Sequence, residues 1–112
     1  MSYKTLEIDK DRWYQFSLAE QLGNIGSEVD RYASLSSINK EYALHALYRA
    51  IDLIDITKSD PRWKGPRRKE INRIKAALCD ATLGDNEYNT PLKYFQDYFL
   101  DFAIVARTRA GK

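Results

Sequence analysis

The sequence predicts an all-α protein built as an antiparallel up-down four-helix bundle, with an irregular N-terminal arm over residues 1–16 and the bundle over residues 17–112. Its 112 residues suit one modest domain, and 44% hydrophobic residues are enough for a core. Five glycines and three prolines are too few for a turn-rich β-sandwich. Apolar residues instead recur at alternating steps of three and four, the spacing of one helix face.

The first helix is expected from Ser17 to about Leu35. Ser17 and Glu20 form a capping box, and Phe16 is the preceding hydrophobic residue. Its apolar stripe consists of Leu18, Leu22, Ile25, Val29 and Tyr32. Three aromatic residues, Trp13, Tyr14 and Phe16, are expected to anchor the arm against the bundle.

The second helix is expected to begin near Ile38 or Asn39 and to stop at the segment 59–61, because Pro61 disfavours helical geometry in the residue before it. Its apolar face is wide, so we expect it to be the most buried helix. One stripe consists of Ala43, Leu47, Ala50 and Ile54, and beside it lie Leu44, Tyr48 and Ile51.

Two further helices complete the predicted bundle. The third begins at Pro66, which suits a first helical position, and Gly84 occupies the place of a left-handed C-cap. The fourth begins at Thr90 and Pro91 and runs to about Arg109. Their apolar stripes are Ile71, Ile74, Leu78 and Ala81 in the third helix, and Leu92, Phe95, Phe99, Phe102 and Ala106 in the fourth.

Positive charge is concentrated in one segment. Residues 58–75 hold eight Lys or Arg against two acids, whereas the whole chain has a net charge of only +2. Such a cluster can neutralise phosphates, and an indole within it can stack on an unpaired base. The predicted nucleic-acid contacts are Arg62, Trp63, Lys64, Arg67, Arg68, Lys69 and Arg73. A solvated face with Trp63 packed on the bundle end, or an acidic protein partner, remains an alternative.

A second set of residues predicts self-association. Tyr94, Tyr98 and Val105 form an extra stripe on the last helix, beside its core face. Gly23 and Gly26 lie inside the first helix, where each costs about 1 kcal/mol relative to alanine, which suggests close approach of another backbone. These five residues are the candidate oligomer interface. The alternatives are an arm packed over the tyrosines, and a glycine contact or kink within the bundle.

No constellation in the chain predicts catalysis, a metal or a cofactor. Glu41, His45 and Arg49 are spaced four apart, as in a surface ladder on one helix face. His45 is the single histidine, so a di-metal centre with paired Glu-x-x-His motifs is not expected. A metal-independent nuclease that uses His45 is the enzymatic alternative. Asp52 and Asp55 are expected on a solvated face or in a salt bridge to an arginine.

The targeting signals and the cysteine bear on the compartment. No stretch approaches the roughly 20 apolar residues of a membrane span. The N-terminus lacks a secretory core, and the single Cys79 fits a reducing compartment, so we expect a cytoplasmic protein. Cys79 itself is interpreted as a small buried hydrophobic residue on the third helix.

Residues 17–29, 48–55 and 84–88 together resemble a family of small, largely uncharacterised helical proteins of bacteria and phages. In size, helix number and basic surface the chain is also similar to the four-helix-bundle accessory proteins of diversity-generating retroelements. That second resemblance implies a homo-oligomer that binds a reverse transcriptase and its template RNA.

Together these observations predict a non-enzymatic accessory or adaptor protein. It would self-associate and bind RNA or single-stranded DNA, or a nucleoprotein partner such as a reverse transcriptase, through the basic segment. The alternative is a protein-only interaction module, antitoxin-like or a scaffold subunit, that does not bind nucleic acid.

Overall fold

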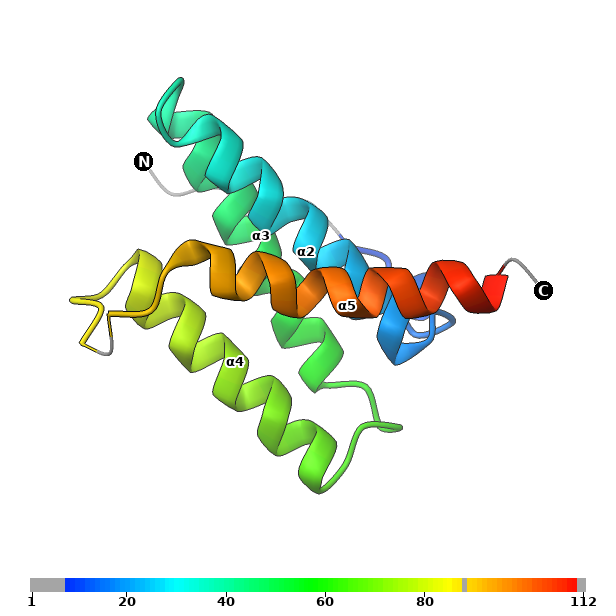
Figure 1. The fold of residues 1–112 in the computed structure, drawn as a ribbon. Helices are drawn as coiled ribbons and strands as arrows, with labels where there is room; N and C mark the ends of the chain where they lie inside the picture. The colour runs from blue at the N-terminus through cyan, green and yellow to red at the C-terminus, as the bar shows by residue number, and fades with distance from the viewer. Residues whose placement is uncertain (1–7, 88, 111–112) are drawn as a thin grey trace.

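A computed structural model describes residues 8–87 and 89–110, with side chains as far as residue 108. In this part of the chain the regular secondary structure is helix only, with no strand, which confirms the all-α class (Figure 1). Its helices are α1 (Lys10–Trp13), α2 (Leu18–Leu35), α3 (Lys40–Lys58), α4 (Pro66–Thr82) and α5 (Leu92–Ala110). No helix within it is both long and apolar enough to cross a membrane.

The predicted start of α2 is confirmed by its capping box. The Ser17 hydroxyl accepts a hydrogen bond from the Glu20 amide at 3.1 Å, and the Glu20 carboxylate accepts one from the Ser17 amide at 2.9 Å. A short turn leads to α3, whose first amides are capped by the side chain of Asn39. The two helices therefore form a hairpin and lie side by side (Figure 1).

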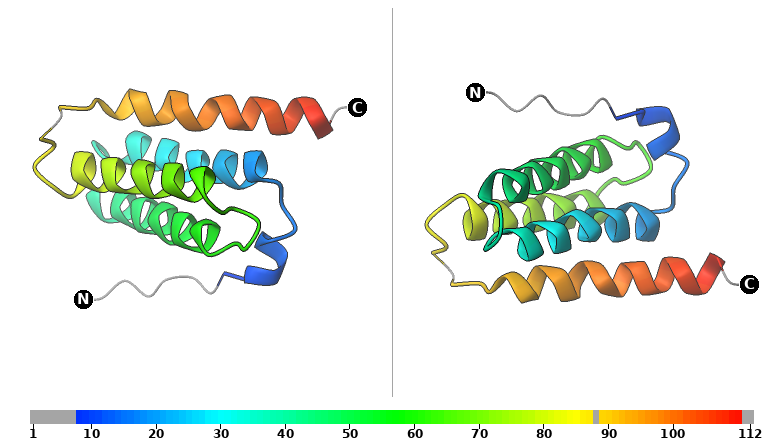
Figure 2. Two further views of the ribbon diagram at one scale, coloured as in Figure 1. Left: turned by 90° about the horizontal axis from the view of Figure 1, so that it is seen from below. Right: turned by 90° about the horizontal axis from the view of Figure 1, so that it is seen from above.

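The other two long helices pack on opposite members of this hairpin. α5 packs against α2, and α4 packs against α3 (Figure 2). The α2–α5 crossing is close because Gly26 is buried and lacks a side chain that would meet Phe99. Gly23 lies against Ala103 one turn away. Both glycines therefore allow α2 to pack closely against α5 of the same chain.

The core lies where the predicted stripes meet. Phe95 and Phe99 of α5 are fully buried, and burying each such side chain contributes roughly 2–3 kcal/mol. The large buried apolar side chains of α2, α3 and α4 are Leu22, Ile25, Val29, Leu47, Leu53, Ile54, Ile71, Ile74 and Leu78. The central positions of the predicted stripes are therefore buried, whereas the stripes omit the buried Leu53.

The arm differs from its prediction in one respect. It is not wholly irregular, because residues 10–13 form the short helix α1, capped by Asp9. Trp13 is buried, and its indole N–H donates to the Thr57 hydroxyl at 3.0 Å. α1 lies on the side of the molecule away from α5 (Figure 2), so the described part of the arm does not cover Tyr94 and Tyr98.

The connection between α4 and α5 also departs from the sequence expectation. Gly84 is not a left-handed C-cap, because the positive φ angles here occur at Asn86 (51°) and Asn89 (52°). Gly84 instead passes close to Asp80, where a Cβ would lie 3.1 Å from the Asp80 Cα. Asn86 stabilises the turn, since its side chain accepts a hydrogen bond from the Thr90 amide at 2.9 Å.

Candidate nucleic-acid interface

The loop between α3 and α4 is held by one buried carboxylate. Asp60 is 1% exposed and accepts hydrogen bonds from the Arg62 guanidinium, the shortest at 2.7 Å. Burial would raise the pKa of Asp60, but the hydrogen bonds from Arg62 and Gln21 outweigh it and lower that pKa. Arg62 also donates to the Phe16 carbonyl at 2.7 Å, which ties the loop to the start of α2.

Gln21 links this carboxylate to both tryptophans. It is fully buried, and its amide nitrogen donates to the Trp13 carbonyl at 3.0 Å and to Asp60 at 3.2 Å. Its amide oxygen accepts a hydrogen bond from the Trp63 indole at 2.8 Å. The arm, α2 and the α3–α4 loop therefore share one polar network inside the molecule.

Trp63 therefore makes its contacts within the chain. Its ring packs against the core, and the Arg62 guanidinium lies 4.4 Å from the ring centroid. The Arg67 guanidinium lies 5.9 Å from the same centroid. The geometry favours a structural role for Trp63 over the expected stacking on a base.

The seven predicted contact residues divide into two groups. Arg62 is paired with Asp60, and Arg73 is paired with Glu70 at 2.6 Å. Arg68 is half-buried and donates to the Asp60 carbonyl at 3.3 Å. These three arginines, with Trp63, stabilise the loop and the start of α4.

The second group keeps its charge open to solvent. Lys64, Arg67 and Lys69 are exposed, and Lys58 at the end of α3 is half-buried. No carboxylate among the described residues lies within 4 Å of any of their charged groups. We call these four residues the basic surface. Lys58 was part of the charge count in the sequence but not of the predicted contact set.

The start of α4 adds to the positive potential of the basic surface. Gly65 is the N-cap, with φ of 64°, and no side chain caps the first amides. The first turn contains no acidic residue. Arg67 and Lys69 therefore lie at the positive end of the helix dipole, where an anion is stabilised.

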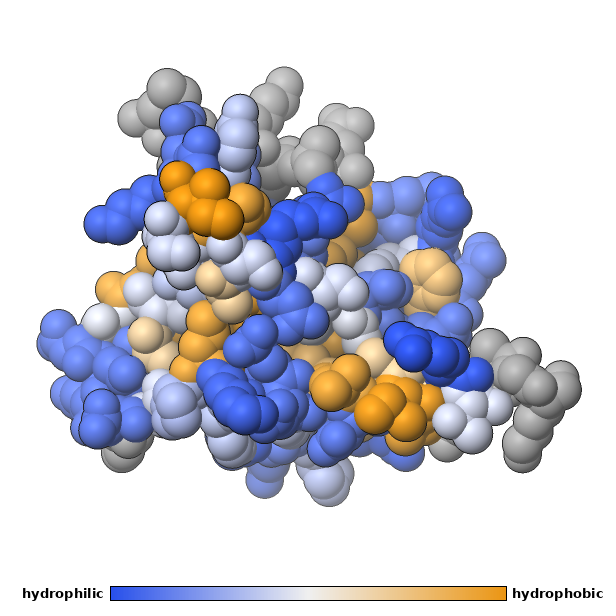
Figure 3. All heavy atoms as spheres, turned by 45° about the horizontal axis from the view of Figure 1, so that its top comes forward, coloured by the Kyte–Doolittle hydropathy of each residue, from blue (hydrophilic) through white to orange (hydrophobic). Residues whose placement is uncertain are grey.

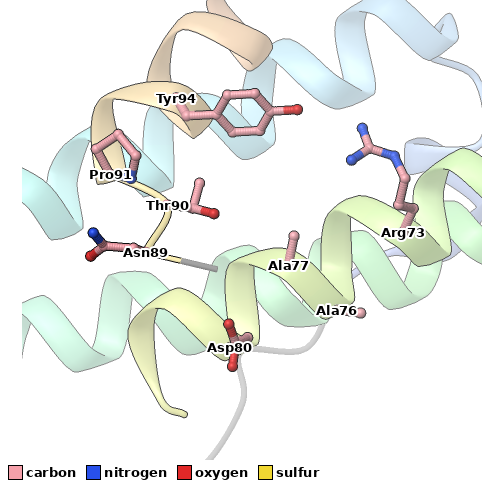
Figure 4. Close-up of a pocket in the computed structure, with 8 residues that line it drawn as sticks. All are labelled: Arg73, Ala76, Ala77, Asp80, Asn89, Thr90, Pro91 and Tyr94. Carbon is pink, nitrogen blue, oxygen red and sulfur yellow. The ribbon is translucent and has the colours of Figure 1, made fainter. Parts of the chain in front are cut away.

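A pocket of about 560 Å³ lies between residues 73–80 of α4 and residues 89–94 at the start of α5 (Figure 4). Ala76, Ala77 and Pro91 give it an apolar lining. Tyr94 forms one wall, and its hydroxyl points toward the side of the pocket that holds Arg73 (Figure 4). Polar groups from Asp80, Asn89 and Thr90 occupy the other end.

The residues predicted for an oligomer interface are used differently in the structure. Gly23 and Gly26 face α5 of the same chain, so their assignment to a subunit contact is corrected. Tyr98 is half-buried, and its hydroxyl donates to Glu70 at 3.1 Å. Tyr94 faces the α4 pocket, whereas Val105 is 40% exposed.

Of the candidate catalytic groups, Arg49 reaches across to α2, where it pairs with the buried Glu28 at 3.0 Å. His45 is exposed on α3. Within the described residues, no group of three or more His, Cys, Asp or Glu side chains is placed to hold a metal ion.

Asp55 of α3 forms an ion pair with Lys75 of α4 at 2.6 Å. Its partner is therefore a lysine, where an arginine was expected. Burial and the charge of Asp55 raise the pKa of the neighbouring Asp52. Cys79 is half-buried, and burial raises the pKa of its thiol, which is consistent with a packing residue rather than a nucleophile.

Comparison of the chain with protein-family models, curated proteins and solved structures gave no match.

Proposed function

We propose that this protein is a non-enzymatic adaptor that binds the phosphate backbone of RNA or single-stranded DNA through its basic surface. The observation that carries the proposal is the open charge of Lys58, Lys64, Arg67 and Lys69 in a chain whose net charge is only +2. Backbone contacts carry little sequence information, so binding is expected to be weakly sequence-specific.

The number of open cations sets the expected salt dependence. Each phosphate that a cation neutralises on a single strand contributes about −0.7 to the slope of log K against log salt concentration. Four such contacts would give a slope of about −3. Arg62 and Arg73 are not counted, because their charges already balance Asp60 and Glu70.

The stacking residue in this proposal is Tyr94 in place of Trp63. Tyr94 is 43% exposed and borders a pocket whose volume is in the range of ligand sites. A base on its ring would place its edge near Asp80 and Asn89, which can accept hydrogen bonds from base amino groups. The phosphates would then continue along α4 toward Arg67.

The scaffold in the proposal is an up-down four-helix bundle formed by α2 to α5, and the protein acts as a homo-oligomer. Self-association places two basic surfaces on one particle. Bivalent binding raises the apparent affinity for a strand long enough to reach both surfaces. A reverse transcriptase or another nucleic-acid enzyme is the proposed protein partner.

Charge reversal on the basic surface tests the proposal. A Lys64→Glu/Arg67→Glu variant should bind a labelled single-stranded RNA about tenfold more weakly, or worse, in an anisotropy titration. Residue 67 lies in the first turn of α4, where an acidic residue is favourable, and residue 64 precedes the helix, so these changes should not unfold α4. Unchanged affinity in this variant would refute the proposal.

Lys40→Glu provides the matched control. Lys40 begins α3 at its far end, about 27 Å along that helix from Lys58, and is exposed. The change alters the net charge by the same amount per site and also lies in a first helical turn. Affinity close to that of the unmodified protein is expected for this variant.

One observation favours a protein-only interaction module as a second candidate. Ile38 is 77% exposed and Tyr42 is 61% exposed, and both lie where α2 turns into α3 (Figure 3 shows an apolar area over this turn). Under this alternative, a pull-down from nuclease-treated lysate retains one protein partner, and Tyr42→Ser removes it. Loss of the partner on nuclease treatment favours the nucleic-acid proposal instead.

A further inference from the structure

We propose that the outward face of α5 is a homodimer surface, on which the α5 helix of a second copy packs in antiparallel orientation. This inference deepens the self-association that forms part of the proposed function. It depends on residues remote from the basic surface and is tested without nucleic acid, so either proposal can fail alone.

The face is defined by five residues spaced four, three, four and three apart. That is the spacing of the a and d positions of a heptad, which produces a single seam along a helix. The seam residues are Lys93, Asp97, Leu100, Ile104 and Arg107. All five are exposed in the structure.

The centre of the seam is apolar although it lies opposite the core. Phe95 and Phe99 lie on the inner side of α5, which packs against α2, and both side chains are fully buried. Leu100 and Ile104 on the outer side are 50% and 49% exposed. Figure 3 shows the corresponding apolar area over the C-terminal half of α5. A helix with apolar residues on two sides gains stability when a second element covers the outer side.

Charge complementarity identifies the occupant as a second copy. A two-fold axis midway between residues 100 and 104 places Leu100 opposite Ile104 of the partner subunit. Asp97 and Arg107 lie three residues further out on either side of that axis. The same operation therefore places Asp97 opposite Arg107 of the partner subunit, so one apolar centre is flanked by two ion pairs.

The charges also select the orientation of the helices. A parallel pair would place each Asp97 opposite its own equivalent, and like charges repel. Arg107 contacts no carboxylate within 4 Å among the described residues. Asp97 pairs with Lys93 of its own helix at 2.9 Å, and an exposed pair of this kind contributes little and can rearrange.

The position of Asp101 provides a second test of the proposed dimer geometry. It lies beside the seam, close to the two-fold axis, so the dimer brings the two Asp101 carboxylates near each other. This repulsion and the short apolar centre imply a weak, concentration-dependent dimer. Neutralising Asp101 should therefore tighten the dimer, whereas altering Asp97 should weaken it.

Sedimentation equilibrium over a concentration series is the experiment. The full chain should fit a monomer–dimer equilibrium. Leu100→Glu and Ile104→Glu should each weaken dimerisation by at least about tenfold, because each variant buries a charge in the apolar centre. The two variants are independent, so one that fails to fold by circular dichroism leaves the other to decide.

A charge exchange tests the register. Asp97→Lys and Arg107→Glu should each weaken the dimer, and the double variant should restore it because the ion pairs re-form with reversed sign. Asp101→Asn is the matched control and should tighten the dimer. A monomeric unmodified chain, a dimer insensitive to Leu100→Glu and Ile104→Glu, or a double variant as weak as either single one would overturn the inference.

Discussion

Gly26 of α2 lies so close to Phe99 of α5 that a Cβ on the glycine would be 2.5 Å from the Cβ of Phe99. Alanine normally stabilises a helix interior by about 1 kcal/mol relative to glycine. Here the added methyl must push α5 away from a fully packed core. We predict that Gly26→Ala lowers the free energy of unfolding by about 1–3 kcal/mol, measured by urea denaturation followed by circular dichroism.

Gly23→Ala is the graded control for this contact. Its Cβ would lie 3.0 Å from the Ala103 Cα, so a smaller displacement of α5 relieves the clash. The loss of stability should be smaller than that of Gly26→Ala. Equal losses at both positions would contradict the observed α2–α5 crossing.

The buried polar network predicts a second loss of stability. Gln21→Leu retains the size of the side chain but leaves the Trp63 indole N–H without its acceptor and removes a donor to Asp60. A buried polar group without a partner costs about 1–3 kcal/mol, so the variant should lose about that amount in urea unfolding. Asn24→Ala, at an exposed position of the same helix, should change stability by less than about 0.5 kcal/mol. An unchanged free energy of unfolding in Gln21→Leu would contradict a stabilising role for this network.

The pH dependence of stability follows from two carboxylates. Hydrogen bonding to Arg73 lowers the pKa of Glu70, and the bonds from Arg62 and Gln21 lower that of Asp60 against the effect of burial. A carboxylate whose pKa is lower in the folded state stabilises the fold above its unfolded pKa of about 4. That contribution is lost as the pH falls through the folded pKa, because the unfolded chain binds the proton first.

Urea unfolding at neutral pH and near pH 3 measures this loss. The unmodified protein should be less stable at the lower pH. Asp60→Asn should be less stable at neutral pH but should lose less on acidification, because one titrating group is removed. An equal acid-induced loss in Asp60→Asn and in the unmodified protein would show that the carboxylate of Asp60 is not the group responsible.

Tyr94 predicts a difference between single strands and duplexes. Stacking contributes about 1–3 kcal/mol per base, and only an unpaired base can reach the pocket. Tyr94→Ala should therefore weaken binding to single-stranded RNA about tenfold and leave duplex binding unchanged, measured by anisotropy. Tyr94→Trp should retain binding because it preserves the aromatic face. Equal losses for both nucleic acids would exclude stacking but would leave the phosphate contacts in place.

Local signals in the sequence were sufficient for the four long helices and for most of the core. The capping box at Ser17 and the proline at position 66 act within a few residues, so both helix starts were predictable. The stripes identified the buried faces, because a helix with one apolar side must cover that side. The short helix α1 was missed, since four residues give no periodic signal.

The candidate site depends on contacts that the sequence does not encode locally. Gln21 reaches Asp60, which is 39 residues away, and Tyr98 reaches Glu70 across 28 residues. A charge count therefore located the basic segment. It did not show that the charge of Arg62 is paired within the loop, whereas the charge of Lys64 remains open to solvent. Tyr94 and Tyr98 were likewise predicted to form an extra stripe on α5. In the structure Tyr98 donates to Glu70 of α4, and Tyr94 borders the pocket between α4 and α5.

The salt dependence of RNA binding shows whether the basic surface recognises phosphates. The affinity of the unmodified protein for a single-stranded RNA should fall with rising salt, with a slope of about −3 in log K against log salt concentration. Lys64→Glu/Arg67→Glu should give a distinctly shallower slope, and Lys40→Glu should keep the original one. Binding that is absent at low salt, or whose slope is the same in all three proteins, would contradict phosphate recognition by the basic surface.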